Sequence, residues 1–401
     1  MDNKTQWKKI VAANKITDLP KYIFTELDEW KIEARKKWNK LGGLIDLGIG
    51  NPDGPTSQEV IDAAIESTKD KVNHGYPSFC GKPNLREAIT SWMKRRYDVD
   101  ITDEFDIQIL NGAKEGLANI AFAFTNPGDI NIIPDPYYPV LSRGTLISGG
   151  TPYYVSLKEE NDFLPDLDTI PEEIAKKAKI FIINYPNNPT AATAPRWFLE
   201  KLVAFCKKYG ILLVSDLAYG EIAFGDYRPL SIFNIDGAFD VAVEFHSCSK
   251  TFNMAGWRVG YVIGNKYLID IIHSMKMNMD YGTSMMVQDA AAKAFTMDYA
   301  SVKETVDNYA RRRIYVRQEL INLGWDIKPT KATMYFWPKI PKGYTSESFC
   351  RMVLDKTGVV FTPGFAFGEL SDGHFRLSVV QPDEKIKEAF DRLKEAGIRY
   401  N

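Results

Sequence analysis

Lys250 is the residue of this chain whose position is hardest to explain by packing alone. It follows the apolar run 241–245 and stands between Ser249 and Thr251, in the stretch HSCSKTFNMAGWRVG. A lysine that loses solvent at the end of a buried strand has a lowered pKa, and its neutral amine can form a Schiff base with an aldehyde. The position therefore predicts covalent chemistry on a carbonyl group.

An anion site is predicted beside this lysine. Arg258, in the same stretch, offers the paired N–H donors of a guanidinium, and Ser247 and Ser249 add two hydroxyl groups. Donors of this kind suit a phosphate. An aldehyde that also carries a phosphate is pyridoxal 5′-phosphate (PLP), and we expect Lys250 to hold this cofactor.

The other groups that PLP requires are found elsewhere in the chain. Asp216 follows the apolar run 211–215 and can pair with a protonated pyridine nitrogen, so that the ring acts as an electron sink. Tyr219 and Asn188 can hydrogen-bond the phenolic oxygen, although turn chemistry before Pro189 also explains an asparagine. These residue types favour a cofactor site of this kind.

Further contacts to cofactor and substrate are predicted at three places. In LNGAKEGLANIAFAF a strand, a glycine turn and a helix are expected, so that the backbone N–H groups of Gly112, Ala113 and Lys114 face an anion. Tyr138 can stack on the pyridine ring, with core packing as the alternative. Arg376 lies within a predicted strand, where a substrate α-carboxylate or a structural ion pair would partner its charge equally well.

Alternating strands and helices must position these residues. Amphipathic helices separate the apolar runs, and one of them is expected over 195–209, with Pro195 in its first turn and Gly210 at its end. Several runs are apolar throughout, as in strands buried on both faces of a parallel sheet. The pattern predicts an α/β fold with a mainly parallel central sheet flanked by helices. The predicted strands are 107–110, 130–133, 152–157, 180–184, 211–215, 241–245 and 259–263.

The length of 401 residues predicts more than one domain. The strand–helix alternation ends near residue 280, and a long helix over 300–323 follows. We expect a large PLP-binding domain over 44–282 and a smaller α+β domain over 283–401. Residues 1–43 are expected to form an arm that packs on the small domain or reaches across a dimer.

Composition and charge exclude several functional classes. The 50 Lys and Arg residues nearly balance the 52 Asp and Glu residues, so no overall field favours nucleic acid or an anionic membrane. No apolar run approaches the ~20 residues of a membrane span, and the first residues do not read as a secretory signal. We expect a cytoplasmic enzyme. The scattered cysteines and the four histidines lack metal-ligand spacing, so no metal site is expected.

These motifs together resemble the fold type I PLP-dependent aminotransferases, over nearly the whole chain. NNPT, SDLAYGE, HSCSKTFNMAGWRVG and GHFRLS occur in the family's order and at similar separations. LPKYIF, IDLGIGNPDGPT and HGYPSFCGKPNLREAI are similar to the branch that holds LL-diaminopimelate aminotransferases and bacterial alanine transaminases. The resemblance implies an aspartate-aminotransferase-like fold.

The resemblance also implies roles for matching residues. Lys250 would be the Schiff-base lysine and the proton shuttle of a ping-pong amino transfer from an L-amino acid to a 2-oxo acid. Arg376 with Asn188 would bind the substrate carboxylate near the Gly50 backbone. Tyr76 matches a tyrosine that family members lend to the phosphate of the neighbouring subunit, which implies a homodimer with shared active sites. Candidates for the substrate side-chain pocket, with packing as the alternative, are Tyr22, Phe79 and Tyr335.

Departures from the family pattern leave the substrate open. Ala191 replaces the glycine after NPT, and Phe79 stands where plant-type diaminopimelate enzymes carry an acidic residue for the distal amino group. DYGT, at 280–283, is similar to the alanine-transaminase side of the branch, whereas KGYTS, at 342–346, is similar to the diaminopimelate side. An LL-diaminopimelate aminotransferase and an alanine or glutamate–pyruvate transaminase are both expected alternatives, with 2-oxoglutarate or pyruvate as the partner.

Other classes of protein remain as alternatives. A C–S lyase, a decarboxylase or a cyclising synthase would use the same scaffold and cofactor. A regulatory binding module is disfavoured because the residues before 44 show no helix-turn-helix and no basic patch. A Rossmann-type oxidoreductase is disfavoured because no GxGxxG opens a helix after the first strand.

Overall fold

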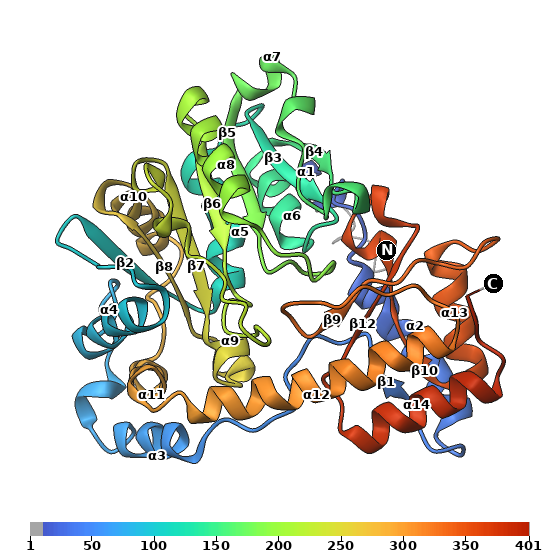
Figure 1. Ribbon diagram of the computed structural model, residues 1–401. Coiled ribbons are helices and arrows are strands. Elements are labelled where there is room, and N and C mark those ends of the chain that lie inside the picture. The colour runs from blue at the N-terminus through green and yellow to red at the C-terminus, as the bar shows by residue number, and fades with distance from the viewer. Residues whose placement is uncertain (1–10, 401) are drawn as a thin grey trace, which may run out of the picture.

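A seven-stranded sheet forms the centre of the molecule's larger part (Figure 1). The computed structural model describes residues 11–400. The strand order is β2-β8-β7-β6-β5-β3-β4, and every pair is parallel except those that β8 makes with β2 and β7. The strands are β2 (Phe105–Leu110), β3 (Ile130–Asp135), β4 (Thr151–Ser156), β5 (Ala178–Asn184), β6 (Leu212–Asp216), β7 (Ala242–Ser247) and β8 (Gly260–Asn265).

Each of the seven apolar runs in the sequence forms one of these strands, so the prediction of a mainly parallel sheet is confirmed. The runs are apolar because helices cover both faces. Alternate residues of β5 show this, since Phe181 packs into a core with α8 (Arg196–Tyr209) while Ile182 packs into another with α5 (Ala113–Phe124). On the α5 side the cover is completed by α6 (Val140–Ser148) and α10 (Lys266–Met277).

The other end of the sheet is covered by three further helices. They are α3 (Gln58–Ser67), α4 (Pro83–Tyr97) and α11 (Met285–Thr296), and α11 packs against both of the others. The predicted helix over 195–209 begins one residue later, at Arg196, because Pro195 has an extended backbone and precedes the first turn. It ends at Tyr209, and Gly210 caps it with a φ of +67°, which suits glycine.

Small strands and three helices form the second part of the chain. There β9 (Tyr335–Phe336), β11 (Thr362–Pro363) and β12 (Phe375–Ser378) form an antiparallel sheet, and β1 (Ile45–Asp46) pairs with β10 (Val359–Val360). The helices of this part are α12 (Ala300–Asn322), α13 (Ser346–Thr357) and α14 (Asp383–Glu395). The N-terminal helix α2 (Ile23–Trp38), with α1 (Asn14–Thr17) before it, packs against α13.

Long helix α12 runs from the foot of the large part to the small one (Figure 1). The predicted domain boundary at 282/283 would assign α11 to the small domain, whereas α11 packs on α3 and α4. The position of the boundary stays a prediction. Among residues 11–400, no helix combines the length and the apolar character that a membrane span requires. The short elements are α7 (Glu172–Ala175), α9 (Cys248–Thr251) and the 3-10 turns Lys71–His74, Glu159–Asn161, Leu167–Thr169, Ile232–Asn234, Ala238–Asp240, Ala255–Trp257, Gly364–Phe367 and Glu369–Ser371.

The sheet places three polar strand ends side by side. Asn184, Asp216 and Ser247 are the last residues of β5, β6 and β7, which are adjacent and parallel. In open α/β sheets ligands bind beyond the carboxyl ends of the strands. Lys250 lies in α9, the single helical turn that follows β7, at this same edge.

Candidate active site

A cavity of about 320 Å³ opens at the carboxyl edge of the sheet. Its wall combines the ends of β5–β7, the start of α5, the segment after β1, and residues of β9 and β12 from the small part. The structure therefore brings most of the predicted site residues together. Those that line the cavity are Tyr22, Gly50, Ala113, Lys114, Tyr138, Asn188, Asp216, Tyr219, Ser247, Ser249, Lys250, Arg258 and Arg376, with Tyr335 beside them.

Lys250 stands in this cavity without an acidic partner among residues 11–400, and its Nζ donates to the carbonyl of Gly50. Burial lowers the pKa of Lys250 to about 8, and the positive charges of Arg376 and Arg258 contribute in the same direction. A lysine in this state supplies an appreciable fraction of neutral amine near neutral pH. The geometry thus supports the nucleophile that the sequence predicts.

Asp216 is buried in the same cavity, at 5% exposure, and forms no ion pair with any residue of the described chain. Burial raises the pKa of its carboxyl to about 7, with a smaller contribution from the charge of Glu244. One Asp216 oxygen accepts from the N–H of Ala218, 3.1 Å away. A buried carboxylate that lacks a cation is costly unless a ligand brings one.

The hydroxyl of Tyr219 belongs to a chain of hydrogen bonds that ends at Arg376. It lies 3.0 Å from the hydroxyl of Tyr335 and 3.4 Å from Nδ2 of Asn188. Oδ1 of Asn188 accepts from Nη1 of Arg376 at 2.7 Å, and Nη2 of Arg376 donates to the carbonyl of Gly48 at 2.7 Å. The polar side chains are therefore fixed relative to one another.

Arg376 is buried at 3% exposure, and its guanidinium lies over the ring of Tyr335. It has no acidic partner among residues 11–400, and its Nε is buried without any hydrogen bond. The structural ion pair considered from the sequence is therefore not found in this part of the chain. A carboxylate from outside would supply the missing negative charge.

Gly112 and Arg258 form the opposite end of the site. Gly112 has a φ of +80°, and a Cβ there would stand 2.5 Å from Nη2 of Arg258. The guanidinium also donates to the carbonyls of Ala255, at 2.8 Å, and Asn111, at 3.4 Å. Helix α5 begins at Ala113, so its first N–H groups face the same space.

The side chain of Lys114 is solvent-exposed and helps to line the rim of the cavity. Its Nζ donates to the hydroxyl of Tyr22 at 3.3 Å and lies 5.7 Å from the ring centre of Tyr138. The guanidinium of Arg143 lies 4.7 Å from the ring centre of Tyr22. Two cations therefore gather around one tyrosine at the rim of the site.

A family model decides what this arrangement is. The model for class I and II aminotransferases matches residues 43–393, which is most of the chain. The chain belongs to this family. This aminotransferase therefore depends on PLP and moves an amino group from an amino acid to a 2-oxo acid.

Individual relatives agree with the family model. The aminotransferase is 46% identical to an LL-diaminopimelate aminotransferase of Aquifex aeolicus over 96% of this chain and 99% of that protein. It is 42% identical to one of Halothermothrix orenii, over 97% and 99% of the two chains. Substrate-bound BacF of Bacillus subtilis has the same fold, with a TM-score of 0.91 and 33% identity over 98% of this chain and 99% of that one. The predicted aspartate-aminotransferase-like fold is confirmed.

The residues of the aminotransferase fit PLP at both ends of the cofactor. Because residue 112 has no Cβ, the guanidinium of Arg258 lies close to the turn. The backbone N–H groups of the turn and this guanidinium can therefore bind one phosphate together. Asp216 is a buried carboxylate suited to a protonated ring nitrogen, and Lys250 is an amine suited to the aldehyde. No cluster of acidic, histidine and cysteine side chains that could hold a metal ion is found among residues 11–400.

Three predicted residues do not line the cavity of this aminotransferase chain: Gly112, which directly precedes the lining residue Ala113, and Tyr76 and Phe79, which lie apart from it. Tyr76 is 80% exposed, and its ring stacks on Tyr281 with 4.4 Å between the centres. Phe79 stacks on the same Tyr281 ring at 5.6 Å. Their predicted roles, Tyr76 at a neighbouring subunit's phosphate and Phe79 at the substrate side chain, stay predictions.

Sequence reasoning missed two polar residues of the aminotransferase site, Asn51 and Asn184. Asn184 lines the cavity; its Oδ1 accepts from the N–H of Asn188 at 2.8 Å, and its Nδ2 donates to the carbonyl of Asp216 at 3.0 Å. The signal was present, because Asn184 ends a predicted strand at the carboxyl edge, as Asp216 does. The apolar lining residues Phe24, Ile49 and Leu117 gave no such signal.

Proposed function

We propose that this aminotransferase moves an amino group between LL-diaminopimelate and 2-oxoglutarate. Four cations line the cavity, and Asp216 is the one acidic residue of the lining in the described chain. Lys250 is assigned to the aldehyde, Arg258 to the phosphate and Arg376 to the substrate α-carboxylate. Among the four cations, Lys114 then has no ligand assigned to it. This observation carries the proposal, because LL-diaminopimelate and 2-oxoglutarate each bear a second carboxylate.

The names of the relatives support the same substrate. Proteins 40–46% identical over nearly the whole chain are called LL-diaminopimelate aminotransferases. In the competing glutamate–pyruvate transaminase, alanine and pyruvate have a single carboxylate and offer no group to Lys114, so only glutamate and 2-oxoglutarate would use its ammonium. Phe79 does not line the cavity of its own chain, so its lack of charge does not count against a diaminopimelate at this site.

The proposed reaction assigns a task to each polar group. PLP, when bound, supplies an aldehyde that combines with amines and a ring that withdraws electrons from the substrate Cα. Lys250 holds the cofactor between turnovers and, once displaced, its neutral amine accepts the Cα proton. Arg376 and Asn188 hold the α-carboxylate, so that the Cα–H bond faces Lys250.

The remaining groups hold charge in place. Asp216 keeps a negative charge against the ring nitrogen, and Tyr219 donates to the phenolic oxygen together with the amide of Asn188. Tyr138 covers the ring face. The N–H groups of residues 112–114, the hydroxyls of Ser247 and Ser249, and Arg258 receive the phosphate. The same cavity takes the amino donor first and the oxo acid second, with Gly50 and Tyr22 at the substrate side.

The substrate proposal is tested with Lys114→Met, which keeps the backbone N–H groups of the turn. Loss of a charge-assisted hydrogen bond of roughly 1.5–3 kcal/mol should raise KM for 2-oxoglutarate and LL-diaminopimelate about tenfold or more. KM for alanine and pyruvate should not change, and Lys114→Arg should retain most of the preference. A wild-type enzyme that turns over alanine with 2-oxoglutarate but ignores LL-diaminopimelate would contradict the proposal.

Two copies of the chain are proposed to form the working enzyme. Tyr76 and Tyr281 are large aromatic residues exposed at 80% and 56%, and Met277 and Met279, at 42% and 52%, lie at the end of α10 and in the loop after it. An exposed apolar patch of this kind marks a contact surface. Tyr76→Arg should shift the protein toward monomer in sedimentation velocity, with loss of activity; a monomeric wild-type enzyme that is fully active would contradict the homodimer.

A cytoplasmic location completes the proposal, supported by four free cysteines.

A further inference from the structure

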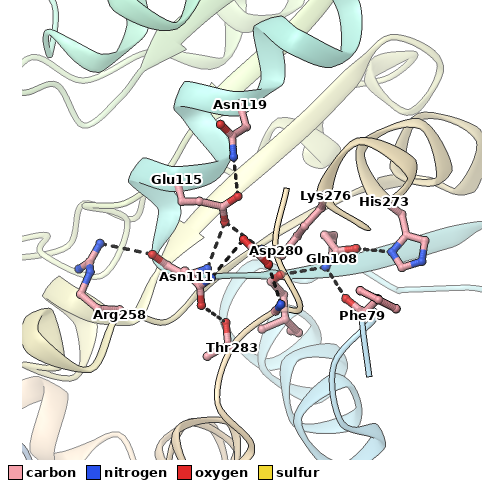
Figure 2. A network of polar contacts seen from close by, with 12 residues as sticks. Phe79, Gln108, Asn111, Glu115, Asn119, Arg258, His273, Lys276, Asp280 and Thr283 are labelled. Atoms are coloured by element: carbon pink, nitrogen blue, oxygen red, sulfur yellow. Dashed lines mark hydrogen bonds and ion pairs between the residues drawn. The ribbon is translucent and has the colours of Figure 1, made fainter. Parts of the chain in front are cut away.

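Asn111, the residue before Gly112, has its N–H, side chain and carbonyl all engaged (Figure 2). Its N–H donates to Oε2 of Glu115 at 3.2 Å, and its Nδ2 donates to Oδ2 of Asp280 at 3.3 Å. Its Oδ1 accepts from the hydroxyl of Thr283 at 2.9 Å. Contacts from two separate elements therefore set the orientation of the peptide that leads into the glycine turn.

The carbonyl of Asn111 reaches the arginine of the site. It accepts from Nη2 of Arg258 at 3.4 Å, while Nη1 of Arg258 is held by the carbonyl of Ala255. The position of Asn111 thus affects both sides of the proposed phosphate site, the turn at Gly112 and the guanidinium that lies against it.

Lys276 joins the two carboxylates that hold Asn111. It lies on α10, its side chain is 1% exposed, and its Nζ donates to Glu115 at 3.2 Å and to the two oxygens of Asp280 at 2.9 and 3.0 Å. Figure 2 shows the ammonium between the two acids. The mechanism proposed above does not use this buried charge.

The charge balance explains why Lys276 matters for the position of Asn111. Glu115 and Asp280 are largely buried, with 19% and 30% of their side chains exposed. Without the ammonium between them, the two carboxylates repel each other and attract water. Either response moves the oxygens that receive the N–H and the Nδ2 of Asn111.

We infer that Lys276 is a positioning residue for the cofactor phosphate, acting through Glu115, Asp280 and Asn111 on the Gly112 turn. The inference rests on the proposed assignment of that turn and of Arg258 to the phosphate. Lys276 itself touches neither substrate nor cofactor. Its loss should therefore weaken the selection for the phosphate more than the capture of the aldehyde by Lys250.

The test compares PLP with pyridoxal, which has the aldehyde but no phosphate. Full-length protein is stripped of cofactor and titrated with each compound, and the visible absorbance band reports binding. In Lys276→Met the dissociation constant for PLP should rise about tenfold or more, because charge-assisted contacts are misplaced, while that for pyridoxal changes less than about twofold. Lys276→Arg, which keeps the charge, should restore part of the preference for PLP.

Lys31 provides a matched control. Its ammonium also lies between two carboxylates, those of Asp28 at 3.1 Å and Asp46 at 2.9 Å, and its side chain is 13% exposed. Lys31→Met should leave the ratio of the two dissociation constants unchanged. A loss of the preference in this variant as well would show that any lost lysine pair disturbs the protein, and would overturn the inference.

Further variants separate the possible failures. If Lys276→Met does not fold, Lys276→Met/Asp280→Leu keeps the net charge of the cluster but removes the oxygen that accepts from Nδ2 of Asn111, so the same loss of preference is expected. A folded single or double variant with the wild-type ratio overturns the inference. Arg258→Met should abolish the preference in any case; if it does not, the proposed phosphate site itself is wrong.

Discussion

Gly112 and Arg258 lie so close that a Cβ on residue 112 would stand 2.5 Å from a guanidinium nitrogen. The two residues are far apart in the sequence, on the turn before α5 and on the loop before β8. Their contact joins the backbone donors of a helix N-terminus to an arginine fork. One anion can therefore be held from both sides.

Gly112→Ala should weaken the binding of PLP. The methyl group displaces Arg258, and the φ of +80° with a ψ of 149° adds roughly 1–3 kcal/mol of strain for an L-residue. Equilibrium dialysis of the holoenzyme should show a larger loss of cofactor than from the wild type. Gly128→Ala is the control, since that glycine also has a positive φ, of +87°, but nothing lies near its Cβ. Equal retention of PLP by both variants would contradict the phosphate assignment.

The rate at which the apoprotein captures PLP should depend on the ionisation of Lys250. Burial and the charges of Arg376 and Arg258 lower the pKa of Lys250 to about 8, so the neutral amine increases about tenfold per pH unit below 8 and levels off above it. Stopped-flow absorbance gives the profile. Arg376→Met should move the plateau to higher pH. A wild-type rate that still rises near pH 10 would mean that Lys250 is not perturbed.

Asp216 should make the apoprotein less stable as the pH rises. Burial raises the pKa of its carboxyl from 3.8 to about 7. The contribution of Asp216 to the free energy of unfolding is therefore complete below pH 3.8 and is lost as the pH rises through 7. The shift corresponds to roughly 4 kcal/mol. In Asp216→Asn this dependence should vanish, and the apoprotein at pH 8 should be more stable than the wild type in urea denaturation, while transamination falls by orders of magnitude. A less stable asparagine apoprotein would contradict the burial argument.

Ala191 occupies a position whose backbone suits glycine better. It is 4% exposed, its φ is +61°, and its N–H donates to the carbonyl of Asn187. Ala191→Gly removes the strain but adds freedom to the unfolded chain, so the free energy of unfolding should rise by no more than about 1 kcal/mol. Ala191→Val should lower it by about 2 kcal/mol, because a branched side chain suits this φ least. The urea denaturation midpoints of the two variants show whether the backbone at residue 191 is strained or accepts the alanine without cost.

The large sheet could be predicted because its strands are buried on both faces. A run such as 180–184 is apolar whatever its partners are, so local sequence is sufficient to indicate the strand. The small strands showed no such pattern. Two-residue β1 pairs with β10, more than 300 positions away, and only the folded chain brings them together.

The site residues divide in the same way, into those that local sequence indicates and those that only the folded chain brings together. Lys250, Asp216 and Arg376 stood out because each is a charge next to an apolar strand. For Lys114 the sequence indicated the backbone of the turn, whereas the structure shows its side chain against Tyr22, a contact across two parts of the molecule. The Glu115–Lys276–Asp280 cluster was missed, since an isolated lysine and two acids in a sequence are typical of any surface.

Reduction of the holoenzyme with borohydride tests the central assignment most directly. The reagent fixes PLP permanently on the lysine that holds it, and peptide mass spectrometry then identifies that residue. The site geometry predicts a pyridoxyl group on Lys250 alone. Modification of another lysine, such as Lys114, with Lys250 unmodified, would contradict the assignment of the active site.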